Sequence, residues 1–380
     1  MEKSRIFLTT PIYYVNDKPH IGHAFSTLVA DVLTRYFRQK GKEVFFLTGT
    51  DEHGSKIYQK SQELKKNPQQ FCDEISFLFK EAWKNLGIEY DYFIRTTDKD
   101  HIETVKYILE FLKKIPFKEV YIHPTILNIE GRRMSKSLGT GIDPLDLIEK
   151  YGADATRFGI ILQTNRDQQA IRFDERSILA ARNFVNKLWN VARFVKMVCE
   201  SKGELKANFK QLSLADRWIM SRLNTIIDSI TKKIKNYEFG EAAKELYEFT
   251  WHEFADWYLE ISKWQMANSE WQKNTLSILY NSLFIILKLF HPFIPFVTEQ
   301  IYQNWKSPKL LMVEDWPKVN KKYINKKIEK EFEEIKELVI KIRNWKAQQK
   351  IPLNQIVDYK LDKDITEKAL VEKIAKVRLI

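Results

Sequence analysis

The sequence predicts an α/β domain with a parallel sheet, followed by an all-α helical bundle. In the first part of the chain, strand-like and helix-like patterns alternate in the order β-α-β-α-β, which is typical of parallel strands joined by crossover helices. From about Ser177 to Trp345 the strand signals almost vanish, and long segments with apolar residues at helical spacing take their place. A chain of 380 residues is also longer than one core usually grows, so two or more domains are expected.

The first domain is expected at residues 1–174. Its strands are predicted at residues 5–14, 43–50, 90–96 and 115–127. Its helices are predicted at residues 21–40, 55–66, 67–87 and 99–114. A loop rich in glycine and serine covers residues 130–142, and Asp143 and Pro144 then occupy the cap and first-turn positions of a new helix.

The helical bundle is expected at residues 175–347, and a short C-terminal tail at 348–380. The bundle helices are predicted at residues 178–198, 214–234, 239–264, 275–305 and 321–350. The last of these mixes both charges along its length, as a solvated helix face does.

Charge and cysteine content limit the classes of function. The net charge of +12 suits a polyanionic partner such as nucleic acid, although a lysine-rich proteome would produce the same balance. The two cysteines, Cys72 and Cys199, lie far apart, so neither a disulfide framework nor a cysteine-rich zinc site is expected. We find no apolar run of membrane-spanning length and no signal-peptide core, so we expect a cytoplasmic protein with no membrane partner.

The segment "PHIGH" at residues 19–23 lies at the start of a predicted helix. Unpaired N–H groups and partial positive charge at a helix N-terminus attract anions. His20 and His23 can donate hydrogen bonds to phosphate oxygens, and Gly22 would let a flat ligand lie against the backbone. Packing or chance would also explain the pair. A metal site would need further ligands, and the other histidines lie in unrelated contexts, so no metal is expected.

The segment "RRMSKS" lies on the loop that follows the fourth predicted strand. Arg133, Ser135, Lys136 and Ser137 place two cations and two hydroxyls between glycines. Such groups can follow the charge that develops on a phosphate chain, which is the stabilisation that nucleotidyl transfer requires. A lone basic loop would mean little, whereas the two motifs in one α/β domain form a specific pair.

These motifs resemble the signature pair of class I aminoacyl-tRNA synthetases of the isoleucine, leucine, methionine and valine subgroup. Residues 5–112, with "TTPIYYVNDKPHIGHAF" and "FFLTGTDEHGSKI", look like the first half of a methionyl-tRNA synthetase. Residues 115–380, with "GIDPLDLIEKYGADATRFG" and "HEFADWYLEISK", look closer to the second half of a valyl enzyme. The resemblance implies a Rossmann-like catalytic domain followed by a helical anticodon-binding domain.

The resemblance also implies roles for individual residues. His20, His23 and Lys136 would be catalytic, and ATP would be bound by His20, Gly22, His23, Arg133, Ser135 and Lys136. The amino acid would be bound by Ile12, Tyr14 and Asp51, and the anticodon by Asn190, Arg193 and Trp257. Other interpretations remain open: Asp51 as a helix cap, and Tyr14 or Trp257 as core aromatics.

The seam near Lys114 and Ile115 departs from the family. A long connective insertion, its zinc ligands, and a strand with its helix are missing there, so the sheet is expected to be a strand short and no structural zinc is expected. Arg133 replaces the family's usual first lysine of the loop motif, and Pro124 follows His123 where relatives have glycine. Several walls of the amino-acid pocket are lost with the missing stretch.

Taken together, these features predict an aminoacyl-tRNA ligase that uses ATP with Mg²⁺, charges a tRNA with methionine, and acts as a monomer. A valine-specific enzyme of the same subgroup is the first alternative, and a non-catalytic tRNA-binding paralogue is the second. A nucleotidyltransferase for small metabolites would share the histidine motif, but it would leave the helical bundle and the basic charge unexplained.

Overall fold

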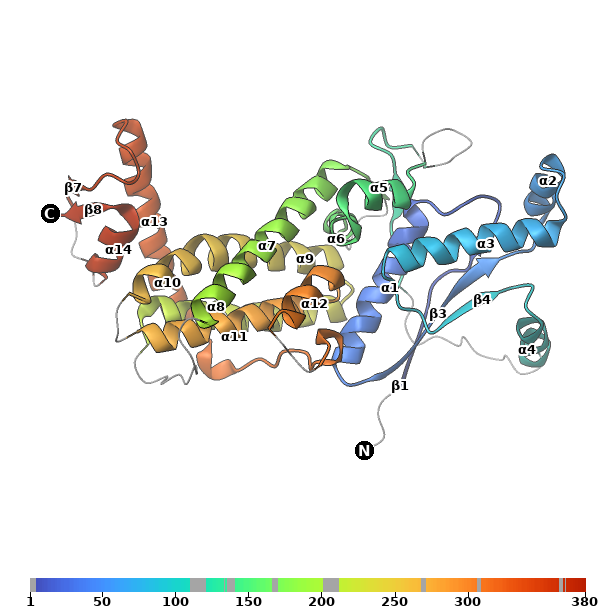
Figure 1. Cartoon of the computed structure of the whole chain (residues 1–380), viewed down its shortest axis with the longest axis horizontal. Coiled ribbons are helices and arrows are strands. Elements are labelled where there is room, and N and C mark those ends of the chain that lie inside the picture. Colours follow the sequence, from blue (N-terminus) through green and yellow to red (C-terminus); the bar gives the residue numbers. More distant parts are fainter. Residues whose placement is uncertain are drawn as a thin grey trace. The chain divides into compact units, whose positions relative to one another are not determined.

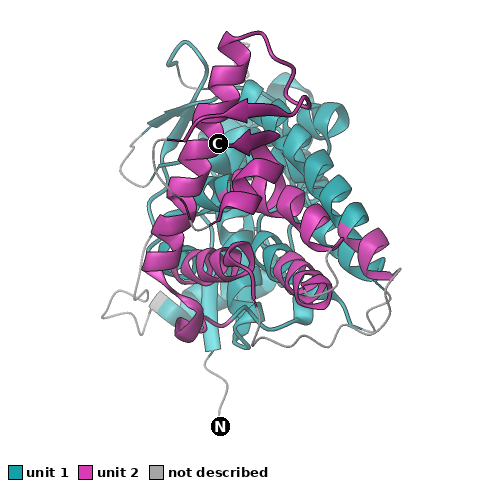
Figure 2. Cartoon of the chain, turned by 90° about the vertical axis from the view of Figure 1, so that its left-hand side faces the viewer, with its two compact units in different colours: residues 1–194, 229–248, 284–317 teal, residues 195–228, 249–283, 318–380 magenta. Residues whose placement is uncertain are grey.

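The computed structural model describes residues 5–109, 121–132, 134, 141–165, 170–200, 212–267, 271–305, 309–361, 365 and 367–380 (Figure 1). It divides into two compact units (Figure 2). Unit 1 comprises residues 1–194, 229–248 and 284–317, and unit 2 comprises residues 195–228, 249–283 and 318–380. Three of the unit boundaries lie within α7 (Arg176–Glu200), α8 (Leu214–Lys235) and α11 (Gln272–Phe290), and the other two follow residues 248 and 317. The boundaries that the sequence suggested, after residues 174 and 347, stay a prediction.

A parallel sheet organises the first part of unit 1, as the sequence predicted. Its strands are β1 (Arg5–Thr9), β2 (Tyr13–Tyr14), β3 (Glu43–Asp51) and β4 (Tyr92–Arg95), and each neighbouring pair is parallel. Leu47 faces both Thr9 and Tyr92, and Thr50 faces both Tyr13 and Arg95. β1 and β2 therefore lie along one edge of β3, and β4 lies along the other. The single strand predicted at 5–14 is thus two short strands, with Pro11 between them.

Helices connect these strands. α1 (Ile21–Gln39) follows β2 and packs on β3. α2 (Ser55–Glu63) and α3 (Pro68–Asn85) separate β3 from β4, and α4 (Lys99–Leu109) follows β4 (Figure 1). Asn67 caps α3 by accepting a hydrogen bond from the N–H of Gln69, and proline occupies the first turn. These helices confirm the alternation that the sequence indicated.

A buried ion cluster joins distant parts of unit 1. The Asp31 carboxylate on α1 accepts hydrogen bonds from Arg35 at 2.8 Å and from Arg157 at 2.7 Å. Arg157 also donates to the carbonyl oxygens of Leu86, Pro292 and Phe293. All three charged side chains are buried. The cluster fixes α1 against α6 (Ala153–Leu162), the loop after α3 and the loop before α12 (Pro295–Gln303).

The remaining elements of unit 1 complete its core. β5 (Thr125–Leu127) pairs in parallel with β6 (Ala170–Arg172) as a separate two-stranded sheet. α5 (Pro144–Tyr151) begins as predicted, with the Asp143 side chain accepting a hydrogen bond from the N–H of Leu145 at 3.0 Å. α9 (Phe239–Glu248) and the short helix η3 (Leu311–Val313) also belong to this unit.

Unit 2 contains a π-helical stretch, η2 (Phe249–Tyr258), between α9 and α10 (Leu259–Gln265). The sequence predicted one continuous α-helix over 239–264. The chain is helical throughout this range, but its middle part is a π-helix rather than an α-helix. π-helical turns are rare and occur frequently at functional sites. Tyr258, at the end of η2, donates a 2.7 Å hydrogen bond to the buried carboxylate of Asp216.

The C-terminal part of unit 2 is ordered around a buried lysine. After η4 (Lys321–Tyr323) and α13 (Lys326–Gln348), the parallel pair β7 (Val357–Tyr359) and β8 (Val377–Leu379) is joined by α14 (Lys368–Ala375). Nζ of Lys346 donates to the carbonyl oxygens of Leu353, Gln355, Ala375 and Lys376. Burial lowers the pKa of Lys346. The segment predicted as a tail therefore contains regular structure packed on α13.

Among the helices that the structure describes, none is both long enough and apolar enough to cross a membrane.

Candidate active site

His20 and His23 begin α1 and cap each other. His20 is the N-cap residue, and its Nδ1 accepts a hydrogen bond from the N–H of Gly22 at 3.0 Å. Nδ1 of His23 accepts from the N–H of His20 at 3.3 Å, and the two rings stack with centroids 3.7 Å apart. A ring nitrogen that accepts carries no proton, so in both neutral imidazoles the proton lies on Nε2. Both histidines thus carry their ring proton on Nε2, beside a helix N-terminus.

Gly22 leaves room for the ring of His20. A Cβ at this position would lie 2.9 Å from Cε1 and 3.1 Å from Nδ1 of the His20 ring. The sequence interpretation gave a different reason, the close approach of a flat ligand to the backbone. The described contacts instead explain the glycine by the folded-back ring of His20, and a ligand role for Gly22 stays a prediction.

Two contacts attach the start of α1 to the far end of the signature loop. The N–H of Ile21 donates to the carbonyl oxygen of Ile142 at 3.2 Å. Nζ of Lys18 forms an ion pair of 2.7 Å with Asp143, and this hydrogen bond raises the pKa of Lys18. The predicted loop residues Arg133, Ser135 and Lys136 lie outside the described residues. The described end of their loop, at Ile142, is nevertheless hydrogen-bonded to Ile21, which lies within the histidine motif.

His123, before β5, contacts the first turns of α1. Its Nδ1 lies 3.0 Å from the carbonyl oxygen of Pro124. Its Nε2 lies 2.8 Å from the hydroxyl oxygen of Ser26, and that hydroxyl also donates to the carbonyl oxygen of Gly22 at 3.2 Å. His123 therefore connects the start of β5 with the first turns of α1.

The predicted amino-acid residues lie at the carboxyl end of the sheet. Asp51 ends β3, and Tyr14 of β2 is its partner in the sheet register. Oδ1 of Asp51 accepts a hydrogen bond from the N–H of His53 at 3.2 Å, so this carboxylate also stabilises the local turn. The Tyr14 hydroxyl lies over Gly54, which has φ +137° and no room for a Cβ. Ile12 is 43% exposed on the segment between β1 and β2.

Sequence reasoning missed Tyr13, which is buried where its neighbour Tyr14 is only half-buried. The Tyr13 hydroxyl lies 2.8 Å from Oγ1 of Thr27, and its ring stacks on Phe79 and lies 5.0 Å from the ring of His23. Burial raises the pKa of Tyr13 to about 12, so it stays neutral. Tyr13 therefore supports the position of His23, and two adjacent tyrosines gave no signal as to which one faces the core.

Sequence reasoning also missed the buried Glu52 beside Asp51. Glu52 accepts hydrogen bonds from Arg95 at 2.7 and 2.9 Å, from Thr50, and from Ser76 and Thr97. Burial raises the pKa of this carboxyl, but these donors more than offset burial, and the net pKa is lowered. The end of β3 is therefore held rigidly. The sequence signal that could have revealed Glu52 is a charged residue placed directly after an apolar strand.

The three predicted anticodon residues lie on two helical segments. Asn190 and Arg193 are exposed and one turn apart on α7, in unit 1. Trp257 is half-buried in η2 of unit 2, and its ring already faces two cations of α13: Nζ of Lys336 lies 5.9 Å and Cζ of Arg343 lies 5.5 Å from the ring centroid. A base that stacks on Trp257 would therefore share this aromatic with a basic helix.

Family models match three stretches of the chain. Residues 6–123 match the model described as tRNA synthetases class I (M), and residues 102–174 match that for tRNA synthetases class I (I, L, M and V). Residues 216–361 match the anticodon-binding domain of tRNA ligase.

Curated relatives and solved structures agree with these models. A valine--tRNA ligase from Carboxydothermus hydrogenoformans is 43% identical over 246 residues, which are 64% of this chain and 28% of that protein. A valine--tRNA ligase from Clostridium tetani is 40% identical over 261 residues, 67% of this chain and 30% of that protein. The chain thus spans less than a third of the length of these relatives.

Two solved structures share the fold at low sequence identity. Mycobacterium tuberculosis methionyl-tRNA synthetase in complex with methionyl-adenylate aligns with a TM-score of 0.65 and 17% identity, over 79% of this chain and 93% of that one. The LeuRS of an Agrobacterium radiobacter ternary complex with tRNA aligns with a TM-score of 0.70 and 10% identity, over 86% of this chain and 88% of that one. The family matches and this fold identify the domains of the chain as those of class I tRNA synthetases of the isoleucine, leucine, methionine and valine group, with their anticodon-binding domain.

Proposed function

We propose that this chain activates an amino acid, methionine first among the candidates, with ATP and transfers it to tRNA. One observation carries the proposal: His20 and His23 are stacked at the N-terminus of α1 with both Nε2 atoms protonated. Two ring N–H donors beside a helix N-terminus form a site suited to a phosphate chain. The amino-acid carboxylate would attack the α-phosphorus of ATP, and pyrophosphate would leave.

The second step needs the same site. A ribose hydroxyl of the tRNA would attack the acyl carbonyl of the adenylate, and AMP would leave with the bond electrons. In both steps the chain's own residues position the reactants and stabilise charge, and no side chain needs to act as a nucleophile. His20 and His23 would donate to phosphate oxygens, and Lys136 would add a positive charge from the loop.

Mg²⁺ would accompany the triphosphate and neutralise part of its charge. Within the described ranges, no group of three or more His, Cys, Asp or Glu side chains is arranged to hold a metal ion. The histidines at α1 are donors at Nε2 and acceptors toward backbone at Nδ1, which suits oxygen atoms of phosphate rather than a metal. We therefore propose that ATP brings the ion.

Methionine is proposed because the residues expected to bind the amino acid, Ile12, Tyr14 and Asp51, lie in the stretch that matches the class I (M) model. Asp51 would take the substrate ammonium, and Tyr14 and Ile12 would contact its side chain. Valine is the second candidate, because the curated relatives named above are valine--tRNA ligases. A non-catalytic tRNA-binding paralogue is the third.

ATP–pyrophosphate exchange with each of the twenty amino acids separates these candidates. We expect methionine to support exchange, with poor discrimination against other apolar amino acids, because the missing stretch removes walls of the pocket. A methylene difference contributes only about 1–3 kcal/mol even in a complete pocket. Exchange that is fastest with valine would replace the methionine assignment, and no exchange with any amino acid would favour the paralogue. A thousandfold preference for methionine over leucine and valine would show that other residues replace the missing walls of the amino-acid pocket.

The anticodon role of the bundle has its own test. Replacing Trp257 by alanine should lower aminoacylation by about 5- to 150-fold, since a stacking contact to an unstacked base contributes about 1–3 kcal/mol. ATP–pyrophosphate exchange should be unchanged, because that step involves no tRNA. Trp251→Ala, in the same π-helical stretch, is the matched control.

The choice of tRNA completes that experiment. Charging is compared on tRNAs with the anticodon CAU and with a valine anticodon ending in AC. A preference for the valine anticodon would overturn the methionine assignment. Equal charging of both would overturn the role of the bundle, whatever the effect of Trp257→Ala.

A further inference from the structure

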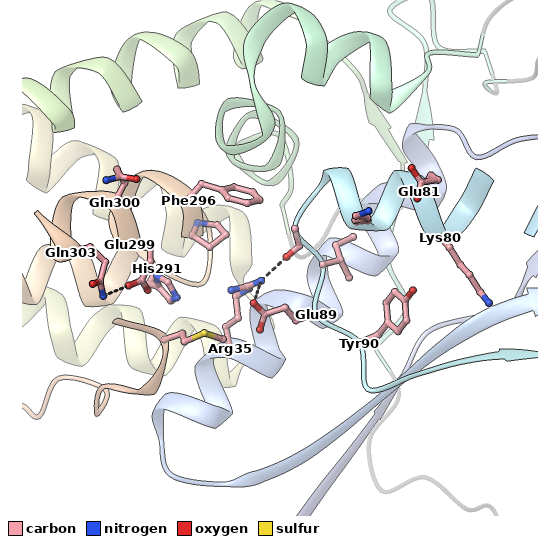
Figure 3. Close-up of a pocket in the computed structure, with 15 residues that line it drawn as sticks. Arg35, Lys80, Glu81, Glu89, Tyr90, His291, Phe296, Glu299, Gln300 and Gln303 are labelled. Carbon is pink, nitrogen blue, oxygen red and sulfur yellow. Dashed lines mark hydrogen bonds and ion pairs between the residues drawn. The ribbon is translucent and has the colours of Figure 1, made fainter. Parts of the chain in front are cut away.

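A cavity of about 820 Å³ lies within unit 1, away from the histidine motif. Its walls come from the end of α1, from α3 and the loop that follows it, and from α12 with the loop before it (Figure 3). Arg35, which lines the cavity, lies 15 positions after His20 along α1, so the two places are roughly 22 Å apart along the helix. A cavity of this volume falls in the range of small-molecule sites.

His291 lines this cavity with an unusual hydrogen-bond pattern. The Thr298 hydroxyl donates to the carbonyl oxygen of Ile294 at 2.8 Å, so its oxygen must accept from Nδ1 of His291, 2.9 Å away. The proton of His291 is therefore on Nδ1, and Nε2 presents a lone pair. Nε2 has no hydrogen-bond partner among the described residues, although the side chain is only 2% exposed.

His291 is also held in its neutral form. Burial, together with the nearby Arg35 and Arg157, lowers the pKa of His291 to about 3. A buried acceptor without a donor costs free energy in a folded protein and is therefore rare unless something supplies the donor.

The charges around the cavity balance. Three basic residues line it, Arg35, Lys80 and Lys84, and three acidic residues line it, Glu81, Glu89 and Glu299. Arg35 is already paired with Asp31 and also with Glu89, and Figure 3 shows the pair with Glu89. Glu299 accepts from the N–H of Leu311 and from Gln303. This balance favours a neutral ligand over an anion.

The other walls are flat and apolar. Ile88, Pro295, Phe296, Tyr90 and Met312 contribute them. Aromatic and aliphatic walls with one convergent polar group are typical of sites for planar ring compounds. Phe296 is 48% exposed, and Met312 has the flexible, unbranched side chain of methionine.

We propose that this cavity binds a small, neutral, planar heteroaromatic compound whose N–H donates a hydrogen bond to Nε2 of His291. Nucleobases and indoles share this chemistry. The site is independent of the ATP site and of the proposed amino acid. Nε2 is buried in the unliganded chain, so binding requires side chains of the cavity wall to move.

Two probes of equal shape test the donor. Indole carries a ring N–H, and benzofuran has an oxygen in its place, so only indole can donate to Nε2. Calorimetric titration of the full chain should show indole binding at least about 10-fold tighter than benzofuran, as expected where a buried acceptor would otherwise stay unpaired. Equal affinity would overturn the assignment of His291, and failure of both probes to bind would overturn the site.

Two variants and one spectroscopic measurement complete the test. His291→Asn keeps an N–H toward Thr298 but removes Nε2, and it should abolish the preference for indole. Phe296→Ala removes a largely exposed wall and should weaken both probes alike. If the His291 variant does not fold, the ¹⁵N resonance of Nε2 in the unaltered chain decides: it should shift with indole and stay constant with benzofuran, and the absence of any shift with indole would contradict the proposal.

Discussion

Alanine in place of His23 is expected to lower ATP–pyrophosphate exchange by about 100-fold or more, the scale for losing one donor to a developing charge. Lys136→Ala should have an effect of the same size. The physical reason for His23 is its Nε2–H, which the hydrogen bond at Nδ1 orients away from the backbone. Pyrophosphate exchange measured at saturating ATP and amino acid provides the readout.

Controls separate catalysis from capping. His23 also caps α1, so its loss would destabilise the helix start by about 1 kcal/mol, which thermal unfolding would register. His23→Gln keeps a side-chain N–H near the position of Nε2 and should recover part of the rate. His101→Ala, on α4, is a histidine control outside the site and should be without effect. Wild-type exchange in both His23→Ala and Lys136→Ala would show that the catalytic assignment is wrong.

The largest effect on stability is expected from Asp31→Asn. The carboxylate lies between Arg35 and Arg157, all three buried, and the amide would remove the ion-pair partner of Arg157 and leave Arg35 only its longer pair with Glu89. Breaking a buried ion pair in this way costs about 3–5 kcal/mol. Urea unfolding should therefore show a lower midpoint for the transition of unit 1, whereas Glu63→Gln, which breaks an exposed pair with Lys60, should leave it unchanged.

The same cluster predicts a pH dependence. Burial raises the pKa of Asp31, but Arg35 and Arg157 more than offset it, so its net pKa is lowered. A lowered pKa means that the stabilisation is complete above the ordinary carboxyl value of about 3.9 and is lost as the pH falls below it. The unaltered chain should lose this contribution in acid, and the Asn variant should lack that part of the pH profile. An identical acid profile for both proteins would contradict the role of Asp31.

Local signals in the sequence predicted the parts of the fold that depend on neighbouring residues. The alternation of strands and helices predicted the parallel sheet, and Asp143 with Pro144 predicted the start of α5. The glycine-separated histidines predicted a helix N-terminus, and α1 begins there. In each case the residues that determine the feature lie within a few positions of it.

The loop that carries the predicted ATP-binding residues is anchored to the start of α1. Arg133, Ser135 and Lys136 lie outside the described residues, so their roles rest on the sequence motif. The structure contributes the anchors of that loop, the Lys18–Asp143 ion pair and the Ile21–Ile142 hydrogen bond. Pattern alone contained no sign of either contact, because a local motif does not report which distant segment of the chain it touches.

The sequence by itself therefore determined the class of the protein and the order of its elements, since these follow from local period, capping and motif. Only the tertiary structure decided which tyrosine supports His23, how Glu52 holds the end of β3, and which cations neutralise Asp31. Arg157 lies 126 positions from Asp31, and no local period reports such a pairing. Buried polar groups take whichever partners the packing brings to them, and their cost when unpaired is what makes those partners specific.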